Sequence, residues 1–223
     1  MGSLFTSFNT GVSGLHTAQS GLNTTSHNLA NVKTKGYTRQ QNIQTDRYYQ
    51  NVKVAVDGSQ IQTGLGTTVS AIRQIRDAFL DKEYHLETGR KAFYEKLSET
   101  SGEIEDIFGE TEGMEFRNNL QSLWNVMQEM ANNPEDITKR RLFVSTAESF
   151  LETAQNIYTQ LNTYQVSLNK EISYQVDRIN TIGETIAYYN KEIAKIEAGG
   201  VENANDYRDA RNLLLDQLAE YTN

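Results

Sequence analysis

The chain of 223 residues contains no cysteine and one proline, Pro134. The lack of cysteine excludes disulfide bonds, thiolate metal sites and a cysteine nucleophile. The scarcity of proline favours long uninterrupted helices, because proline removes a backbone donor and clashes with the preceding turn. Hydrophobic residues make up only 37% of the chain, which favours elongated helices with a large surface over a compact enzyme.

Charge is absent from the first 32 residues and unevenly distributed over the rest. Residues 1–92 carry 10 Lys and Arg against 6 Asp and Glu, whereas residues 93–223 carry 11 against 23. The net charge of -8 and the pI near 5.0 argue against nucleic acid as the main partner, since phosphate binding needs a clustered cationic surface.

The uncharged first segment has apolar residues at helical spacing and predicts a helix with one apolar stripe. Its other residues are too polar for a membrane span, and it lacks the cationic start of a signal peptide, so we expect no membrane insertion. We predict that the stripe is an assembly interface formed by Phe5, Phe8, Val12, Leu15, Leu22 and Leu29.

Glycine makes this helix weak on its own. Gly11, Gly14 and Gly21 each cost about 1 kcal/mol relative to Ala inside a helix, so we expect the helix to become ordered only against partner subunits. Gly14 and Gly21 also leave room for a neighbouring helix to approach closely. The alternative is a loop-prone terminus.

Turn residues divide the next part of the chain into short segments. Asn31 and Gly36 permit the left-handed backbone that ends a helix and turns the chain. Alternating polar and branched residues then predict a small irregular β region over residues 38–75, with turns at Asp57-Gly58 and at Gly64–Gly66. Helical spacing returns at Phe79 and continues to the breaks at Gly109 and Gly113.

The second half of the chain carries the strongest helical periodicity. One amphipathic helix runs from Phe116 to Met130 and ends before Pro134. A longer helix, from about Thr138 to Ala198, alternates steps of three and four with one stutter after Leu168, and would be about 90 Å long. We predict that the core of a helical bundle contains Trp124, Phe150, Ile157, Leu161, Leu168, Ile179, Ile186 and Ile193.

The expected fold is therefore mainly α, an elongated helical bundle with long coiled-coil-like helices and a small irregular β region near residues 38–75. We divide it into an assembly helix and turn (1–37), an extended and β-hairpin region leading into a helix (38–92) and a helical bundle domain (93–223). Gly199-Gly200 should end the long helix, and another apolar helix begins near Tyr207. Because that helix is apolar and close to Asn223, we expect further sequence, including partner helices, in the natural protein.

Several motifs give the chain a resemblance to a known family. Ser13-Gly14-Leu15 with Ala18 and Leu22 is followed by a turn motif of Asn28, Leu29, Ala30, Asn31, Val32, Gly36 and Tyr37. These residues resemble the N-terminal signature of bacterial flagellar rod, hook and hook-associated proteins.

Three further stretches are similar to the hook-associated members of that family. They are Gly66–Val69 with Ile75–Leu80, Trp124–Asp136, and Asn205–Arg211 with Leu213–Asp216. The sequence departs from the family pattern at Lys35, Tyr207 and Asn212, positions where turn and helix-surface roles are preserved.

The resemblance implies a structural subunit of the external flagellar axis that joins the curved hook to the stiffer filament by self-assembly through terminal amphipathic helices. It implies export by the flagellar type III apparatus and an extracellular location. The implied partners are copies of the chain, the hook protein, the next hook-associated protein and, through a missing C-terminal part, an export chaperone. Alternatives are another axial subunit, of hook or rod, or a helical coiled-coil adhesin or sensor module.

No residue pattern predicts catalysis, a cofactor or a metal site. His16 and His27 lie about 16 Å apart along a helix, too far to share a metal ion. His85 lacks the cysteine ligands of a zinc deaminase, and the acidic residues of 103–112 lack the spacing of a calcium loop. Phosphate-binding loops and nucleophile motifs are also missing.

Overall fold

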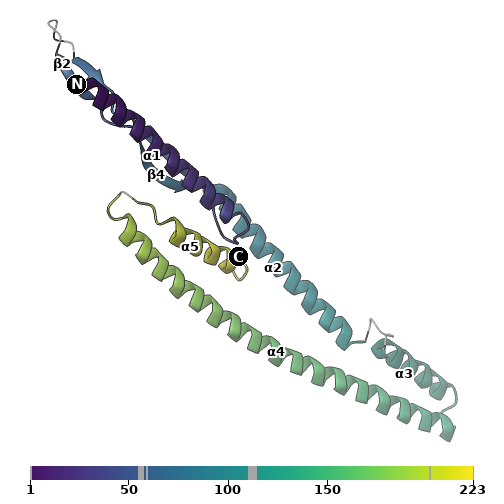
Figure 1. The fold of residues 1–223 in the computed structure, drawn as a ribbon. Coiled ribbons are helices and arrows are strands. Elements are labelled where there is room, and N and C mark those ends of the chain that lie inside the picture. Colours follow the sequence, from purple (N-terminus) through teal and green to yellow (C-terminus); the bar gives the residue numbers. More distant parts are fainter. Residues whose placement is uncertain (1, 55–57, 59, 110–114, 201, 223) are drawn as a thin grey trace. The chain divides into compact units, whose positions relative to one another are not determined.

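The computed structural model describes residues 2–54, 58, 60–109, 115–200 and 202–222. Within these ranges the chain forms five helices and two small antiparallel sheets (Figure 1), which confirms the predicted mainly α class with a small β region. The contacts define two compact units, one of residues 1–87 with 181–222 and the other of residues 88–180. The division into 1–37, 38–92 and 93–223 stays a prediction.

The first unit begins with helix α1 (Gly2–Ala30), which ends one residue after the last predicted apolar position. The side chain of Asn31 closes this end, because its Nδ2 donates to the carbonyl oxygen of His27 at 3.0 Å. Gly36 then has a φ of 83°, a left-handed conformation that glycine adopts without steric cost. The predicted turn between α1 and the β region is confirmed.

The β region consists of two separate hairpin-like pairs. Strand β1 (Gln40–Asp46) pairs with β4 (Thr67–Gln74), and β2 (Gln50–Val54) pairs with β3 (Gln60–Thr63); each pair is antiparallel with one irregularity in its register. The predicted break at Gly64–Gly66 lies between β3 and β4. Of the predicted turn Asp57-Gly58, Asp57 lies outside the described residues, and Gly58 has a φ of 84°.

Helix α2 (Ala78–Ile107) and helix α4 (Ile137–Glu197) contribute residues to both units. Gly109, with a φ of 66°, follows α2 as predicted, and Gly113 lies outside the described residues. Helix α4 is continuous through the predicted stutter and ends before Gly200, whose φ is 64°. Helix α5 (Asn205–Leu218) starts two residues earlier than predicted, because the Arg208 amide already donates to the carbonyl of Ala204.

In the second unit, α3 (Glu115–Asn132) packs against α4 through aromatic and polar contacts. The Phe116 ring lies 5.7 Å from that of Phe150 and 5.8 Å from that of Phe108. Lys96 of α2 donates to both carboxylate oxygens of Glu171 of α4 at 2.8 and 2.9 Å. The three rings form a small aromatic cluster, and the ion pair separately links α2 to α4 within the second unit.

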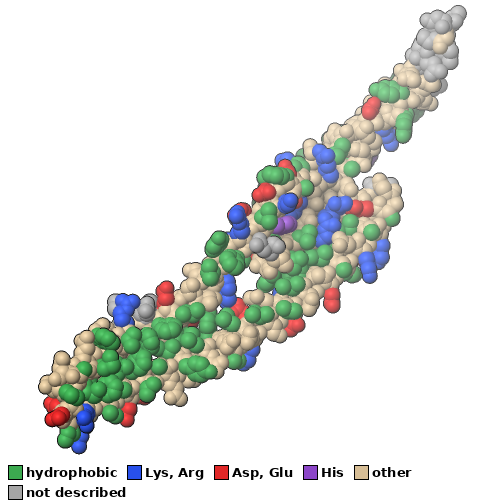
Figure 2. Space-filling view, turned by 180° about the vertical axis from the view of Figure 1, so that it is seen from behind, with side chains coloured by type: hydrophobic (Ala, Val, Ile, Leu, Met, Phe, Trp, Pro, Cys, Tyr) green, Lys and Arg blue, Asp and Glu red, His purple; other side chains and the backbone are tan. Residues whose placement is uncertain are grey.

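The predicted core residues differ in their burial. Ile157 and Ile193 are buried, whereas Phe150, Leu161, Leu168, Ile179 and Ile186 are intermediate. Trp124 is 52% exposed and is not a core residue of this chain alone; its place in a bundle with further helices stays a prediction. Figure 2 shows hydrophobic side chains gathered over one face of the second unit, where α3 and the first half of α4 lie.

Ile182 of α4 is the most buried large side chain of the described residues, at 1% exposure. We predict that Ile182→Ala lowers the free energy of unfolding by about 2 to 5 kcal/mol, because truncation removes buried apolar surface and leaves a cavity. Urea denaturation monitored by circular dichroism would measure the change. Ile172→Ala on the same helix is the control, since Ile172 is 57% exposed. Equal midpoints for the two variants would contradict the assigned core.

Candidate assembly site

The face of α1 that packs on the β1–β4 sheet is polar. Ser13, Thr17 and Thr24 are its buried residues, and Thr17 and Thr24 donate to backbone carbonyls one turn earlier in the helix at 3.0 Å. Because these hydroxyls are satisfied within the helix, they can be buried with little desolvation cost. Small side chains also let helix and sheet approach closely: a Cβ on Gly66 would lie 2.0 Å from the Ser13 Oγ.

Hydrogen bonds fix the register of α1 on the sheet. The Ser13 Oγ accepts from the backbone amide of Thr67 at 3.2 Å, and Asn42 Nδ2 donates to Ser20 Oγ at 3.1 Å. Asn28, at the end of the helix, pairs with the backbone of Gln40: its Nδ2 donates to the Gln40 carbonyl, and its Oδ1 accepts from the Gln40 amide, both at 2.9 Å. The side-chain amide thus takes the place of a neighbouring strand.

Tyr37 completes this contact. Its hydroxyl donates to Asn28 Oδ1 at 2.7 Å and lies 3.1 Å from Nδ1 of His27. Burial, followed by the charges of Asp209 and Asp206, raises the pKa of the Tyr37 hydroxyl above its ordinary value of 10.0, so it remains a donor. The turn motif of residues 28–37 therefore holds the end of α1 against the start of β1.

The opposite face of α1 carries the predicted stripe and is exposed. Phe5, Phe8, Leu15, Leu22 and Leu29 are each 68 to 74% exposed, and Val12 is intermediate. Leu4, at 81% exposure, belongs to the same face and was missed by the sequence analysis. Its spacing of four residues from Phe8 is the signal that places it there. The role of this face as an assembly interface stays a prediction.

Helix α5 contacts the residues that follow α1 and the end of β4. Asp209 Oδ1 accepts from the backbone amide of Thr38 at 3.1 Å and from Gln74 Nε2 at 2.7 Å. The turn glycine is part of the same contact, because a Cβ on Gly36 would meet the Leu213 side chain at 3.0 to 3.2 Å. The sequence analysis identified both motifs and not their pairing.

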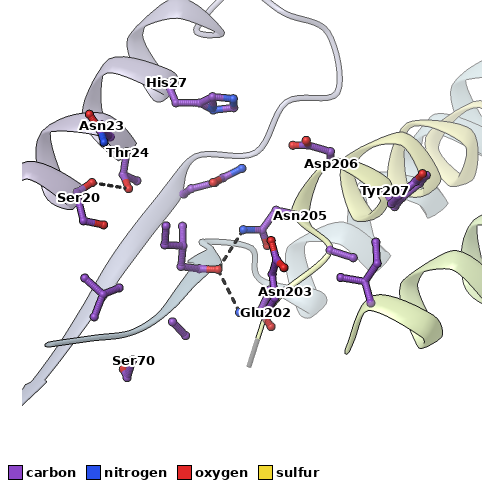
Figure 3. Close-up of a pocket in the computed structure, with 16 residues that line it drawn as sticks. Ser20, Asn23, Thr24, His27, Ser70, Glu202, Asn203, Asn205, Asp206 and Tyr207 are labelled. Atoms are coloured by element: carbon purple, nitrogen blue, oxygen red, sulfur yellow. Dashed lines mark hydrogen bonds between the residues drawn. The ribbon is translucent and has the colours of Figure 1, made fainter. Parts of the chain in front are cut away.

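A cleft of about 650 Å³ lies between α1, β4 and the start of α5. Figure 3 shows Asn203 and Asn205 on one side and His27, Thr24 and Ser20 of α1 on the other. The amides of Asn203 and Asn205 both donate to the carbonyl of Ile72 at 3.0 Å. These bonds tie the chain before α5 to the strand that also supports α1.

Two carboxylates of this region have pKa values shifted in opposite directions. Arg208 donates to both oxygens of Glu197 at 2.6 Å and thereby lowers the pKa of that carboxyl below its ordinary 4.5. Burial raises the pKa of the Asp209 carboxyl above its ordinary 3.8, against the hydrogen bonds from Thr38. Both groups lie where α5 is anchored.

The remaining candidates considered in the sequence lie in separate contacts, and Glu110 and Glu112 lie outside the described residues. His85 Nε2 lies 2.8 Å from Asp216 Oδ1, a contact between α2 and α5, and His16 lines a cleft between α1 and the strands. Within the described ranges, no three His, Asp or Glu side chains gather as a metal site. None of the helices in those ranges has both the length and the apolar character to cross a bilayer.

The Glu197 pair predicts a pH dependence with a definite sign. In the unfolded chain the carboxyl takes up its proton near pH 4.5, and in the folded chain only at lower pH. The pair therefore stabilises the fold above pH 4.5, and this contribution is lost as the pH falls through the folded pKa. We predict that Glu197→Gln is less stable than the wild type at neutral pH and that the difference shrinks below pH 4.5.

Urea denaturation over a pH series measures this difference. Asp209→Asn is the control with the opposite sign. Because the pKa of Asp209 is raised in the folded chain, its ionisation lowers the free energy of unfolding of the wild type as the pH rises above 3.8. Asp209→Asn should therefore gain stability relative to the wild type over that range. Parallel pH profiles for the wild type and Glu197→Gln would contradict the assignment.

Two known protein families match separate parts of the chain. The family described as flagellar hook-associated protein FlgK helical domain matches residues 101–223, and the family of flagella basal body rod proteins matches residues 8–38. No solved structure gives a significant match.

Curated relatives match almost the whole chain. Flagellar hook-associated protein 1 of Bacillus subtilis is 30% identical over 98% of this chain and 43% of its own length. The proteins of the same name from Salmonella typhimurium and Escherichia coli are 28% and 26% identical over 94% of this chain and 37% of their own length. The chain thus spans less than half the length of these relatives, and by its helical domain it belongs to the FlgK family of flagellar hook-associated proteins, which are structural proteins and not enzymes.

Proposed function

We propose that this chain belongs to a hook-filament junction subunit, which self-assembles through the exposed apolar face of α1. The observation that carries the proposal is that α1 has two opposite faces. Its polar face, with Ser13, Thr17 and Thr24, is buried on the β1–β4 sheet, and its apolar face, with Phe8, Leu15, Leu22 and Leu29, is exposed. A helix that used its apolar face for its own core would show the reverse.

The size of the apolar face supports an interface. Burying one large apolar side chain contributes about 1.5 to 3 kcal/mol, so the six exposed side chains from Leu4 to Leu29 represent about 10 kcal/mol. That is comparable with the whole stability of a typical domain, about 5 to 15 kcal/mol. Contiguous exposed apolar surface of this extent marks a site of association.

The glycines of α1 are suited to close packing between helices. A Cβ on Gly11, Gly14 or Gly21 would meet nothing within 4 Å in the single chain. Each glycine therefore weakens the helix without serving a contact inside the chain. A neighbouring helix that approaches closely at these positions would account for them.

Copies of the same chain are the main partners in this proposal. The proposal adds the hook protein, the next hook-associated protein and an export chaperone as further partners, and membership of a flagellar family supports partners within the flagellum. The location is extracellular, in the flagellum. A rod or hook subunit is the weaker alternative, because the rod-protein match covers only α1 and the following turn.

We predict that Leu22→Asp prevents incorporation into the flagellar axis and leaves the soluble chain as stable as the wild type. Leu22 is 68% exposed, so a charge there costs little until the face is buried against a partner. Motility and immunoblotting of purified flagella measure incorporation, and thermal denaturation of the soluble protein measures stability.

Asn9→Asp is the matched control, because Asn9 is exposed on α1 outside the apolar stripe and the change adds the same charge. It should assemble normally. If Leu22→Asp assembled as well as Asn9→Asp, the stripe would not be the interface; if it melted at a much lower temperature, the stripe would belong to the core of the chain.

Gly14 and Gly21 are expected to have opposite effects on the stability of the single chain and on its assembly. The double variant Gly14→Ala/Gly21→Ala should raise the helix content and stability of the soluble chain, since each change favours the helix by up to about 1 kcal/mol and has space around it. The same variant should assemble less well, because the added methyl groups hold a neighbouring helix away. Circular dichroism and flagellar incorporation report the two effects, and normal assembly would remove the close-packing argument.

A further inference from the structure

A second cleft, of about 340 Å³, lies where the end of β4, the start of α2 and α5 meet in the first unit. Four of its lining residues are arginines, Arg73, Arg76, Arg208 and Arg211, and only one, Asp81, is acidic. This composition is unusual in a chain with a net charge of -8. The cleft lies away from the apolar stripe of α1.

Two of the four arginines have carboxylate partners. Arg76 forms an ion pair with Asp81 and lies 3.6 Å from Asp216 Oδ1. Arg208 forms a two-point ion pair with Glu197, both bonds at 2.6 Å. The charges of these two guanidinium groups are therefore balanced within the chain.

Arg211 has only neutral partners. Its Nη1 donates to Asn190 Oδ1 and its Nη2 to Asn212 Oδ1, both at 3.3 Å, and its Nε is buried without a hydrogen-bond partner. Burial, and then the charges of Arg208 and Arg76, lower the pKa of the Arg211 guanidinium. The charge of Glu197, which Arg208 already pairs, acts in the opposite direction. A guanidinium always carries its charge in proteins, so Arg211 is a cation without an ion pair of its own and with an unused donor.

Arg73 is the second arginine of the cleft without an ion pair. Its side chain is exposed, and among the described residues it has no ion pair and no side-chain hydrogen bond. Two arginines without carboxylates thus line one cleft beside two that are already paired. Arg211 is half-buried, and its buried Nε lacks a hydrogen-bond partner, which has a cost that an oxyanion in the cleft would remove.

We propose that this cleft binds an oxyanion, which Arg211 and Arg73 hold between them. Guanidinium groups present planar forked donors that match carboxylate and phosphate oxygens. The buried Nε of Arg211 supplies a donor that no group of the described chain uses, and Arg73 adds an exposed guanidinium to the lining of the same cleft.

The oxyanion has two possible sources with the same chemistry. One is an Asp or Glu side chain of a second copy, since residues 93–223 carry 23 acidic residues against 11 basic ones. The other is a small anion from solution, such as inorganic phosphate. Inorganic phosphate is a suitable probe for both, because it occupies the site in the second case and competes for it in the first.

The test measures the thermal stability of the soluble chain as inorganic phosphate replaces chloride at constant ionic strength. Phosphate should raise the melting temperature of the wild type, because a ligand that binds only the folded state stabilises it. Arg73→Gln and Asn212→Asp should each weaken phosphate binding about tenfold or more. Asn212→Asp places a carboxylate beside Arg211 without removing it, so the variant should also melt at a higher temperature than the wild type in chloride.

Arg39→Gln is the matched control, because Arg39 is exposed, lies outside the cleft and carries the same charge. It should bind phosphate like the wild type, and so should Leu22→Asp, which tests the assembly proposal separately. Equal phosphate effects in the wild type, Arg73→Gln and Asn212→Asp would overturn the oxyanion site, and so would the absence of any effect in the wild type.

A final measurement distinguishes the two sources. If a carboxylate of a second copy occupies the cleft, phosphate should slow self-association of the wild type and have no such effect on Arg73→Gln. If a small anion occupies it, self-association should be unchanged or faster in phosphate. Light scattering at constant ionic strength records either result, and both support the site.

Discussion

The arrangement of the first unit depends on the polar contact between α1 and the β1–β4 sheet. Small hydroxyl side chains let the helix lie close to the strands, and the Asn28 amide pairs with the backbone of Gln40 at both of its polar ends. This contact sets the rotation of α1 about its own axis. Because the polar face is turned inward, the apolar stripe has to face outward, and the surface proposed for assembly is a consequence of a hydrogen-bonded interior.

The polar inner face of α1 fixes the register of the helix on the sheet, but it contributes little to the free energy of unfolding. A net hydrogen bond contributes about 0.5 to 1.5 kcal/mol, and an unmade one costs more. Sliding α1 by one turn would leave Ser13 without Thr67 and Asn28 without Gln40, so one register is preferred. For a subunit proposed to bury its apolar face against neighbours, such a contact orients the helix while leaving most of its apolar surface for the assembly.

Helix α5 and the residues before it bind the segment just before β1 and the end of β4. Asp209 binds the Thr38 amide 171 residues away, and Asn203 and Asn205 bind the carbonyl of Ile72. The charged residues near α5 have two different roles. Glu197 and Arg208 link the end of α4 to α5, whereas Arg211 donates only to the neutral side chains of Asn190 and Asn212 and has an unpaired donor in the cleft proposed to bind an oxyanion.

The sequence alone determined the helices and the stripe of α1, and it placed the start of α5 two residues late. The helices and the stripe depend on local periodicity, on glycines with left-handed backbone and on the single proline. The sequence could not determine that Ser13 and Thr17 would be buried, since a hydroxyl side chain on a helix can face either solvent or a neighbouring sheet once it is hydrogen-bonded within the helix. Nor could it predict that Trp124 would be half exposed or that Asp209 would meet Thr38. The Asp209–Thr38 bond uses a backbone amide, and every residue except proline has one. The amino-acid sequence therefore does not indicate which amide is used, and only the tertiary structure decides it.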